Sequence, residues 1–367
     1  MTELAASHPL ADSHPLAEYG WNDRVEADFA PYAPKGLLPG RVVRVDRGRC
    51  EVVTLAADGS SVLTLDADPA PVASRDPMWA VCAGDWVALD PEADPAAVRV
   101  LLPRRTAFVR STSSKRSEGQ VLATNIDYAV IAISLAVELE LERVERFLAL
   151  AWECGAQPMV VMTKSDLIHE PETLRFLSED IRDAAPDVPV LAVSARTGAG
   201  LDELAARLSD GTSVLLGQSG AGKSTLANVL VGQDLQEVKA ARDSDGKGRH
   251  TTTRRDLLVL PGGGTLIDTP GLRGVGLWDA AHGLSLLFSD VEDLADSCRF
   301  HDCSHTAEPR CAVLAAVADG ELSQRRLESY RKLTNENEWI AERIDARQRE
   351  EVRRNWKRGA KRGAVRD

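Results

Sequence analysis

The stretch Gly217-Gln-Ser-Gly-Ala-Gly-Lys-Ser224 decides the fold of this chain. It matches the pattern G-x-x-x-x-G-K-[ST], follows the apolar run TSVLLG and precedes an apolar helical pattern. Glycines let successive backbone N–H groups turn toward an anion, and the helix that follows adds the positive end of its dipole. The stretch therefore predicts a phosphate-binding loop in a P-loop α/β domain.

The side chains of this loop predict how a nucleotide is held. Lys223 would reach the β and γ phosphates, and the hydroxyl of Ser224 would bind Mg²⁺. A chance glycine-rich turn is the alternative, and the flanking strand and helix argue against it. The predicted contacts are Gly217, Gln218, Ser219, Gly220, Ala221, Gly222, Lys223, Ser224 and Thr225.

Three further short motifs follow apolar runs that are typical of buried strands. Thr163-Lys164-Ser165-Asp166 approximates N-K-x-D, in which the aspartate accepts hydrogen bonds from guanine N1 and N2 and the lysine stem covers the ring. The backbone at Ser194-Ala195 can donate to guanine O6, and Asp268-Thr-Pro-Gly271 places a carboxylate near Mg²⁺ and an amide near the γ-phosphate. Each motif alone could be an ordinary turn. Ligands of open α/β sheets bind at the carboxyl ends of the parallel strands. The joint occurrence of the three motifs at such strand ends therefore predicts a guanine nucleotide.

The order of these motifs is unusual. A Ras-like GTPase has its P-loop first and N-K-x-D and S-A last, whereas here residues 163–166 and 194–195 precede Gly217 and residue 268 comes after it. The short link SDGTS joins what would be the last helix of that fold to its first strand. A sheet can stay the same while the chain ends move, so the sequence predicts a circularly permuted Ras-like domain.

The regions on either side of this domain have different patterns. Residues 1–35 are rich in proline and alanine and repeat the string SHPLA, which predicts a flexible arm. Several short β-rich runs between residues 36 and 110 predict a small barrel, most simply an OB-fold. A charged helix is predicted from Ser323 to about Trp356, followed by a basic tail with Arg353, Arg354, Lys357, Arg358, Lys361, Arg362 and Arg366.

The composition restricts the class of protein. The chain has 367 residues, a net charge of −12 and 44% hydrophobic residues, which fits a multidomain globular protein. We expect no membrane attachment, because the sequence contains neither a signal peptide nor an apolar run long enough for a membrane span. The scattered Cys50, Cys82 and Cys154 favour a reducing cytoplasm over a disulfide framework.

The other three cysteines form a cluster with a histidine. The spacing Cys298-x4-Cys303-x-His305-x5-Cys311 supplies three thiols and an imidazole, a set suited to tetrahedral structural Zn²⁺. His301 is a competing fourth ligand by spacing. Four protein ligands leave no position for water, so this predicted site has no catalytic role.

Taken together, the permuted motifs, the preceding barrel, the segment Gly248-Arg-His-Thr-Thr-Thr253 and the cysteine cluster resemble the RsgA (YjeQ) family of GTPases that depend on the small ribosomal subunit. The resemblance covers about residues 36 to 340, with Thr163 in the place of the usual asparagine. It favours His305 over His301 as the zinc ligand. It also implies three parts after the arm: an OB-fold over residues 36–110, the permuted GTPase domain over 120–285 and a helical zinc domain over 286–367.

The resemblance further implies a function. The protein would be a cytoplasmic monomer that hydrolyses GTP slowly alone and faster on the small ribosomal subunit, and that acts late in the maturation of that subunit with ribosomal RNA as its partner. Leu272 stands where Ras-type enzymes have a water-orienting glutamine, so the catalytic helper must lie elsewhere, and His250 is the candidate. Thr252 would sense Mg²⁺, although by spacing Thr251 and Thr253 are equal alternatives.

Two other classes of function compete with this interpretation. A guanine-nucleotide-dependent RNA-binding switch with negligible turnover would differ in its hydrolysis kinetics. An ATP-using nucleic-acid enzyme would differ in its nucleotide preference.

Overall fold

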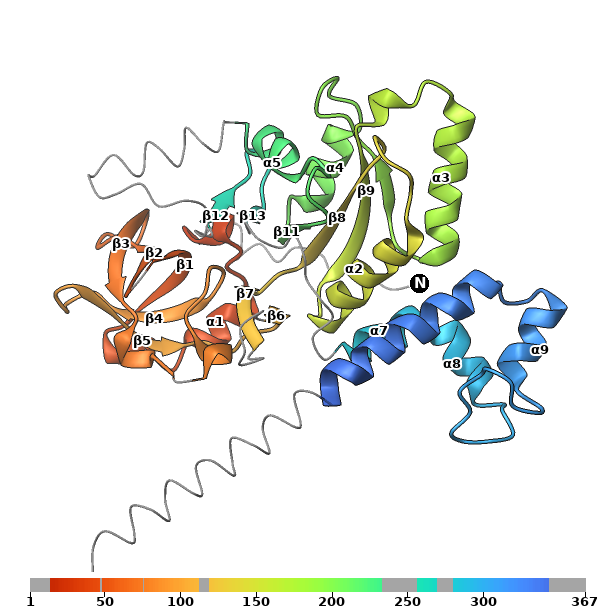
Figure 1. Ribbon diagram of the computed structural model, residues 1–367. Coiled ribbons are helices and arrows are strands. Elements are labelled where there is room, and N and C mark those ends of the chain that lie inside the picture. The colour runs from red at the N-terminus through yellow and green to blue at the C-terminus, as the bar shows by residue number, and fades with distance from the viewer. Residues whose placement is uncertain are drawn as a thin grey trace, which may run out of the picture.

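The computed structural model describes residues 14–46, 48–74, 76–111, 119–232, 256–268 and 280–342. Figure 1 shows a barrel and a central α/β part that share one extended sheet, and a helical C-terminal part beside α2. None of the described helices is long and apolar enough to span a membrane.

The central part is built on parallel strands in the order β10-β9-β8-β11-β13, followed by β12, which is antiparallel to β13 and pairs on its other side with β1 of the barrel. Strand β11 precedes the P-loop and lies between β8 and β13. Within the central part, the strands that come before β11 in the chain lie on one side of it and those that come after lie on the other, as the permuted motif order predicts. The strands are β8 (Tyr128–Ser134), β9 (Gln157–Thr163), β10 (Val190–Ala192), β11 (Thr212–Leu216), β12 (Asp256–Val259) and β13 (Thr265–Asp268).

Helices cover both faces of this sheet because neighbouring strand residues alternate between the two faces. Ile131 packs in one apolar cluster with Leu148 of α2 (Leu141–Glu153) and Ile181 of α3 (Pro171–Ala184). Its neighbour Val130 packs in a second cluster with residues of α4 (Leu201–Leu208) and α5 (Lys223–Val231). The loops between strands and helices therefore meet at the carboxyl edge of the sheet.

The N-terminal barrel has the strands β1 (Leu38–Asp46), β2 (Arg49–Leu55), β3 (Val62–Asp68), β4 (Trp86–Asp90) and β5 (Ala96–Leu101). Their order is β1-β2-β3-β5-β4, and β4 pairs back onto β1 to close the barrel. Inward-facing aliphatic side chains such as Val42, Val52 and Val98 fill it. This architecture confirms the predicted OB-type barrel. The hairpin of β6 (Ala107–Ser111) and β7 (Gly119–Thr124) leads to the central part.

The expectation of a flexible arm is wrong for residues 14–35. Asn22 caps α1 (Asp23–Phe29) by accepting hydrogen bonds from the N–H groups of the next turn, and 3-10 turns lie on either side, at Ala17–Tyr19 and Ala33–Lys35. Trp21 is buried edge-on against Trp86, with 5.4 Å between the ring centroids. Within this proline- and alanine-rich region, α1 has a short amphipathic pattern with Val25 and Phe29 on its buried face. Residues 1–13 lie outside the described residues.

The C-terminal part packs on α2. It contains α7 (Ala281–Leu287), α8 (Ser289–Ala295), α9 (Ala312–Asp319) and a helix described over residues 324–342. Glu145 of α2 is fully buried and forms ion pairs with Arg325 and Arg326 and accepts a hydrogen bond from Ser329. The predicted helix from Ser323 is present to residue 342, and the rest of it and the basic tail lie outside the described residues.

Candidate nucleotide site and metal centre

The P-loop has the backbone geometry that its sequence predicts. It connects the end of β11 at Leu216 to the start of α5 at Lys223. Gly217 has φ = 134°, and a Cβ there would lie 2.3 Å from the carbonyl oxygen of Ala132, so only glycine fits. The Nζ of Lys223 donates to the carbonyl oxygens of Gly217 and Gln218 at 2.6 Å each. The lysine therefore lies over the loop, where it could turn to a phosphate.

A cavity of about 560 Å³ opens beside this loop at the carboxyl edge of the sheet. Residues of segments 163–169 and 193–196 line it together with Gly222 and the first turn of α5. The structure thus brings the predicted base-binding motifs together beside the phosphate-binding loop. The predicted residues that line it are Thr163, Lys164, Asp166, Ala195, Gly222 and Thr225.

The carboxylate of Asp166 is held at this cavity by two neighbours. Ser194 donates to its Oδ1 at 2.5 Å, and Arg196 donates to its Oδ2 through Nε at 2.8 Å and Nη2 at 2.7 Å. These hydrogen bonds, with that of Ser194 the strongest, lower the pKa of the Asp166 carboxyl below its usual value. The group is therefore an ionised acceptor at neutral pH, which is what guanine N1–H and N2–H require.

Replacing Asp166 with asparagine should reduce GTP affinity tenfold to a hundredfold, because one of the two acceptors becomes a donor that faces another donor. Affinity for xanthosine nucleotides, which carry an oxygen in place of the amino group, should rise. Nucleotide titration of Asp166→Asn measures both changes. Unaltered GTP affinity in this variant would remove Asp166 from the base site.

Thr163 explains how the chain manages without the usual asparagine. It ends β9 and is 4% exposed, and its hydroxyl donates to the carbonyl oxygen of Ala221 in the P-loop at 2.8 Å. The hydroxyl oxygen of Thr163 also lies 3.2 Å from the carbonyl oxygen of Ile133. Lys164 adds a second link, from its Nζ to the carbonyl oxygen of Gly220 at 3.0 Å. The end of β9, which is predicted to bind the base, is therefore bonded directly to the P-loop.

The isosteric change Thr163→Val should weaken GTP and GDP binding alike, by about tenfold, because it leaves a buried loop carbonyl without its donor. Thr163→Ser, which keeps the hydroxyl, is the matched control and should stay within about threefold of the parent. Fluorescent-nucleotide titration measures both. Equal affinities in the valine and serine variants would contradict the proposed role of this hydroxyl.

The residues predicted to bind magnesium and the γ-phosphate lie only partly within the described residues. Asp268 ends β13, which runs parallel to the P-loop strand, and Ser224 is exposed in the first turn of α5. A hydroxyl and a carboxylate are the oxygen donors that Mg²⁺ prefers, so these residues fit the ion. His250, Thr252 and Gly271 lie outside the described residues.

Sequence reasoning missed five residues of the cavity. They are Leu167, His169, Val193, Arg196 and Leu226. Leu167 and His169 follow the aspartate motif and Arg196 follows Ser194-Ala195, so adjacency in sequence was the available signal. Nothing in the sequence indicates that Arg196 pairs with Asp166, thirty residues earlier.

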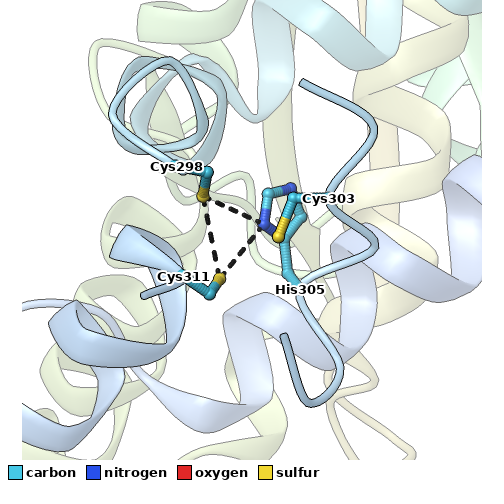
Figure 2. Close-up of side chains that lie close together, drawn as sticks. All are labelled: Cys298, Cys303, His305 and Cys311. Atoms are coloured by element: carbon cyan, nitrogen blue, oxygen red, sulfur yellow. Dashed lines mark hydrogen bonds between the residues drawn. The ribbon is translucent and has the colours of Figure 1, made fainter. Parts of the chain in front are cut away.

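The cysteine cluster forms a compact centre in the C-terminal part (Figure 2). One ligand atom from each of Cys298, Cys303, His305 and Cys311 lies within 4.8 Å of the others. The Nδ1 of His305 points to the sulfurs and lies 3.4 Å from Cys311 Sγ. Three thiols and one imidazole at this spacing fit a tetrahedral zinc ion. His301, the competing ligand by spacing, is not in the cluster.

The peptide backbone around the cluster supports thiolate ligands. The N–H of Ala312 donates to Cys298 Sγ at 3.3 Å, and the N–H of Leu314 donates to Cys311 Sγ at 3.4 Å. Both donors belong to the first turn of α9, whose dipole also favours negative charge. Backbone donors of this kind orient metal ligands.

Replacing Cys303 with serine should release zinc and unfold the segment between α8 and α9, while nucleotide binding in the distant cavity changes little. Elemental analysis and GDP titration of the same preparations test this expectation. His301→Ala is the matched control and should retain one zinc per chain. Parent protein that carries no stoichiometric zinc would refute the metal centre.

Two family models match the chain. The model described as RsgA GTPase matches residues 101–278, and one described as 50S ribosome-binding GTPase matches residues 212–349. A protein of Streptomyces avermitilis named small ribosomal subunit biogenesis GTPase RsgA is 66% identical over 348 residues, which cover 95% of this chain and 92% of the relative. The chain belongs to the RsgA GTPase family. It is accordingly a GTP hydrolase.

More distant relatives agree with this assignment. An RsgA protein of Syntrophotalea carbinolica is 41% identical over 94% of this chain and 97% of its own length. The crystal structure of YjeQ from Thermotoga maritima matches with a TM-score of 0.58 and 25% identity over 82% of this chain and 98% of that one. YloQ, titled a circularly permuted GTPase, matches in fold with a TM-score of 0.60 at 24% identity over 82% and 95% of the two chains. The RsgA fold, including its permutation, is thus confirmed.

Proposed function

We propose that this chain hydrolyses GTP on the small ribosomal subunit, is stimulated by that subunit and assists its late maturation. The observation that carries the proposal is the cavity that Asp166 lines together with Gly222 of the P-loop. The hydrogen bond from Thr163 to Ala221 ties this strand end to the same loop. The names of its relatives, which describe small ribosomal subunit biogenesis GTPases, supply the partner. We further propose that the protein acts as a monomer in the cytoplasm and contacts ribosomal RNA.

The residues of the site divide the work of phosphoryl transfer. Asp166 and the backbone at Ala195 would select guanine, and Lys223 would leave its loop carbonyls to neutralise the β and γ phosphates. Ser224 and Thr252 would hold Mg²⁺, with Asp268 in its surrounding shell; the ion, when bound, offsets charge on the phosphate oxygens. Gly271 would contact the γ-phosphate through its amide. His250 would accept a hydrogen bond from the attacking water.

Single-turnover GTP hydrolysis with and without purified small subunits tests the proposal. We expect slow hydrolysis by the free protein and much faster hydrolysis with subunits. Equally slow hydrolysis in both would favour the competing function, a guanine-nucleotide-dependent binding switch. Competition by ATP as strong as by GTP would contradict the guanine assignment.

Replacing His250 with alanine should keep GTP binding and subunit association but lose stimulated hydrolysis by about a hundredfold or more, the usual effect of removing a group that handles the proton of the attacking water. His301→Ala, a change at an exposed histidine outside the zinc cluster, is the control. Stimulated turnover at the parent rate in His250→Ala would end the assignment.

A further inference from the structure

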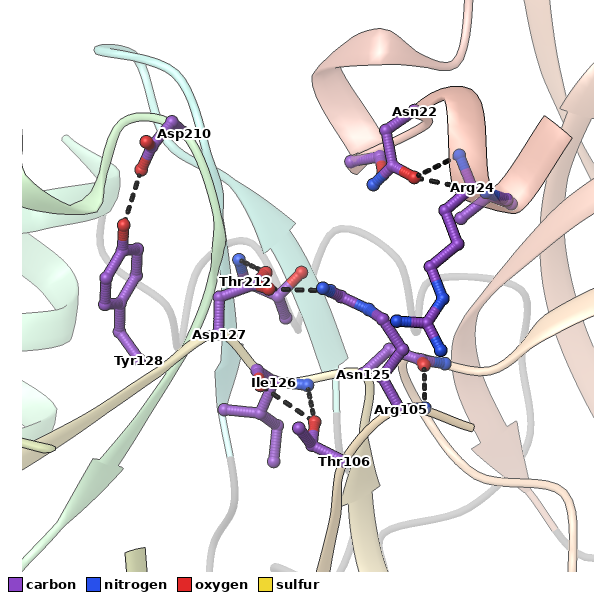
Figure 3. A network of polar contacts seen from close by, with 12 residues as sticks. Asn22, Arg24, Arg105, Thr106, Asn125, Ile126, Asp127, Tyr128, Asp210 and Thr212 are labelled. Carbon is purple, nitrogen blue, oxygen red and sulfur yellow. Dashed lines mark hydrogen bonds and ion pairs between the residues drawn. The ribbon is translucent and has the colours of Figure 1, made fainter. Parts of the chain in front are cut away.

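Two buried arginines of barrel strand β1 join the barrel to the GTPase part. The first, Arg41, is 2% exposed, and its Nη2 donates to the Thr212 hydroxyl at 3.1 Å, at the start of the P-loop strand. Its guanidinium lies 4.7 Å from the Trp86 ring, and burial lowers the pKa of Arg41 to about 10. Thr212 also donates its backbone N–H to Asp127, which pairs with Arg105 (Figure 3). This end of the junction is thus tightly bonded.

The second arginine, Arg44, lies toward the nucleotide edge of the sheet. It is directly opposite Asp256 where β1 pairs with β12, and Asp256 is directly opposite Asp268 where β12 pairs with β13. Directly opposed residues on antiparallel strands point to the same face with their Cβ atoms about 5 Å apart. Arg44, Asp256 and Asp268 therefore form a row across three strands. The row ends at the carboxylate predicted to lie near Mg²⁺.

The buried carboxylate of Asp256 in this row is paired by an arginine of the barrel. Asp256 is 1% exposed, and its Oδ1 accepts from Arg44 Nε at 2.5 Å. Arg44 is 4% exposed and pairs with Glu51 of β2 at 3.1 Å. In the described part of the chain, Oδ2 of Asp256 has no hydrogen-bond partner. A buried carboxylate with one oxygen unsatisfied depends strongly on its cation, so Asp256 keeps its place only while Arg44 does.

We propose that Arg44 is a positioning residue that links the barrel to the GTP site through Asp256. This inference rests on the proposed function. It adds the contact through which the barrel and the GTP site would influence each other. Displacement of the barrel by a bound RNA surface would move Arg44, and with it the β12 and β13 strand ends. By thermodynamic reciprocity, exchange of GTP for GDP at the site would in turn alter the barrel.

Hydrogen exchange of the full chain tests this link without ribosomes. With a non-hydrolysable GTP analogue and Mg²⁺, amides of β1 and β2 should exchange at a different rate than with GDP. The double variant Arg44→Gln with Asp256→Asn should lose this difference, because it removes both charges yet leaves no buried unpaired ion. Its GDP affinity should stay within about twofold, since neither residue lines the base cavity.

The matched control is the ion pair of Arg104 and Asp85, 2.7 Å apart. Asp85 also accepts a hydrogen bond from the Thr124 hydroxyl, and this pair does not bond to β12. Arg104→Gln with Asp85→Asn should keep the nucleotide-dependent difference. An identical exchange pattern with both nucleotides in the parent, or an undiminished difference in the Arg44 double variant, would overturn the inference.

Subunit-stimulated hydrolysis separates this inference from the proposed function. Stimulation should fall about tenfold in the Arg44 double variant, within the range measured for coupling residues, and should persist in the control. A parent protein that shows Arg44-dependent exchange but no stimulation would contradict the proposed function alone. Stimulation that survives in the Arg44 double variant would contradict the inference alone.

Discussion

The pairing of β12 with a strand on each side is the interaction on which the arrangement of the molecule depends. β13 of the GTPase part pairs with one edge of β12 and β1 of the barrel with the other, so among the described residues a single sheet of eleven strands runs through both parts. Backbone hydrogen bonds in a sheet do not slide freely, because register fixes which side chains are buried. The barrel is therefore held in register with the strand ends that carry the nucleotide site.

The C-terminal part is held to the GTPase part by a buried arginine and its ion pairs. Arg326 is 5% exposed in its side chain and bonds to Glu145 of α2, to Asp290 of α8 and to the carbonyl oxygens of Ala184 and Leu287. It also lies over the Phe288 ring at 4.4 Å. Removing one partner from such a buried pair typically costs about 3–5 kcal/mol. The C-terminal part, which carries the cysteine cluster, is thus anchored to α2, the helix whose first turns lie beside the P-loop.

The sequence predicts the features that are local and misses those that are not. The P-loop, the zinc spacing and the permuted order follow from short motifs whose chemistry demands those residues at that spacing. The buried pairs Arg44–Asp256 and Arg326–Glu145 join residues 212 and 181 positions apart, and no periodicity marks them. The sequence does not predict that residues 14–35 are folded, because their core contacts, such as Trp21 on Trp86, are made with barrel strands that come later in the sequence. Thr163 was identified, but its bond to Ala221 required the fold.

The most direct test of the central claim is a cryo-electron map of the protein with small ribosomal subunits and a non-hydrolysable GTP analogue. We expect one copy on the subunit, guanine in the cavity at Asp166, and direct contact between the protein and ribosomal RNA. Subunits that remain free of the protein under conditions in which it is saturated with the analogue would contradict the account.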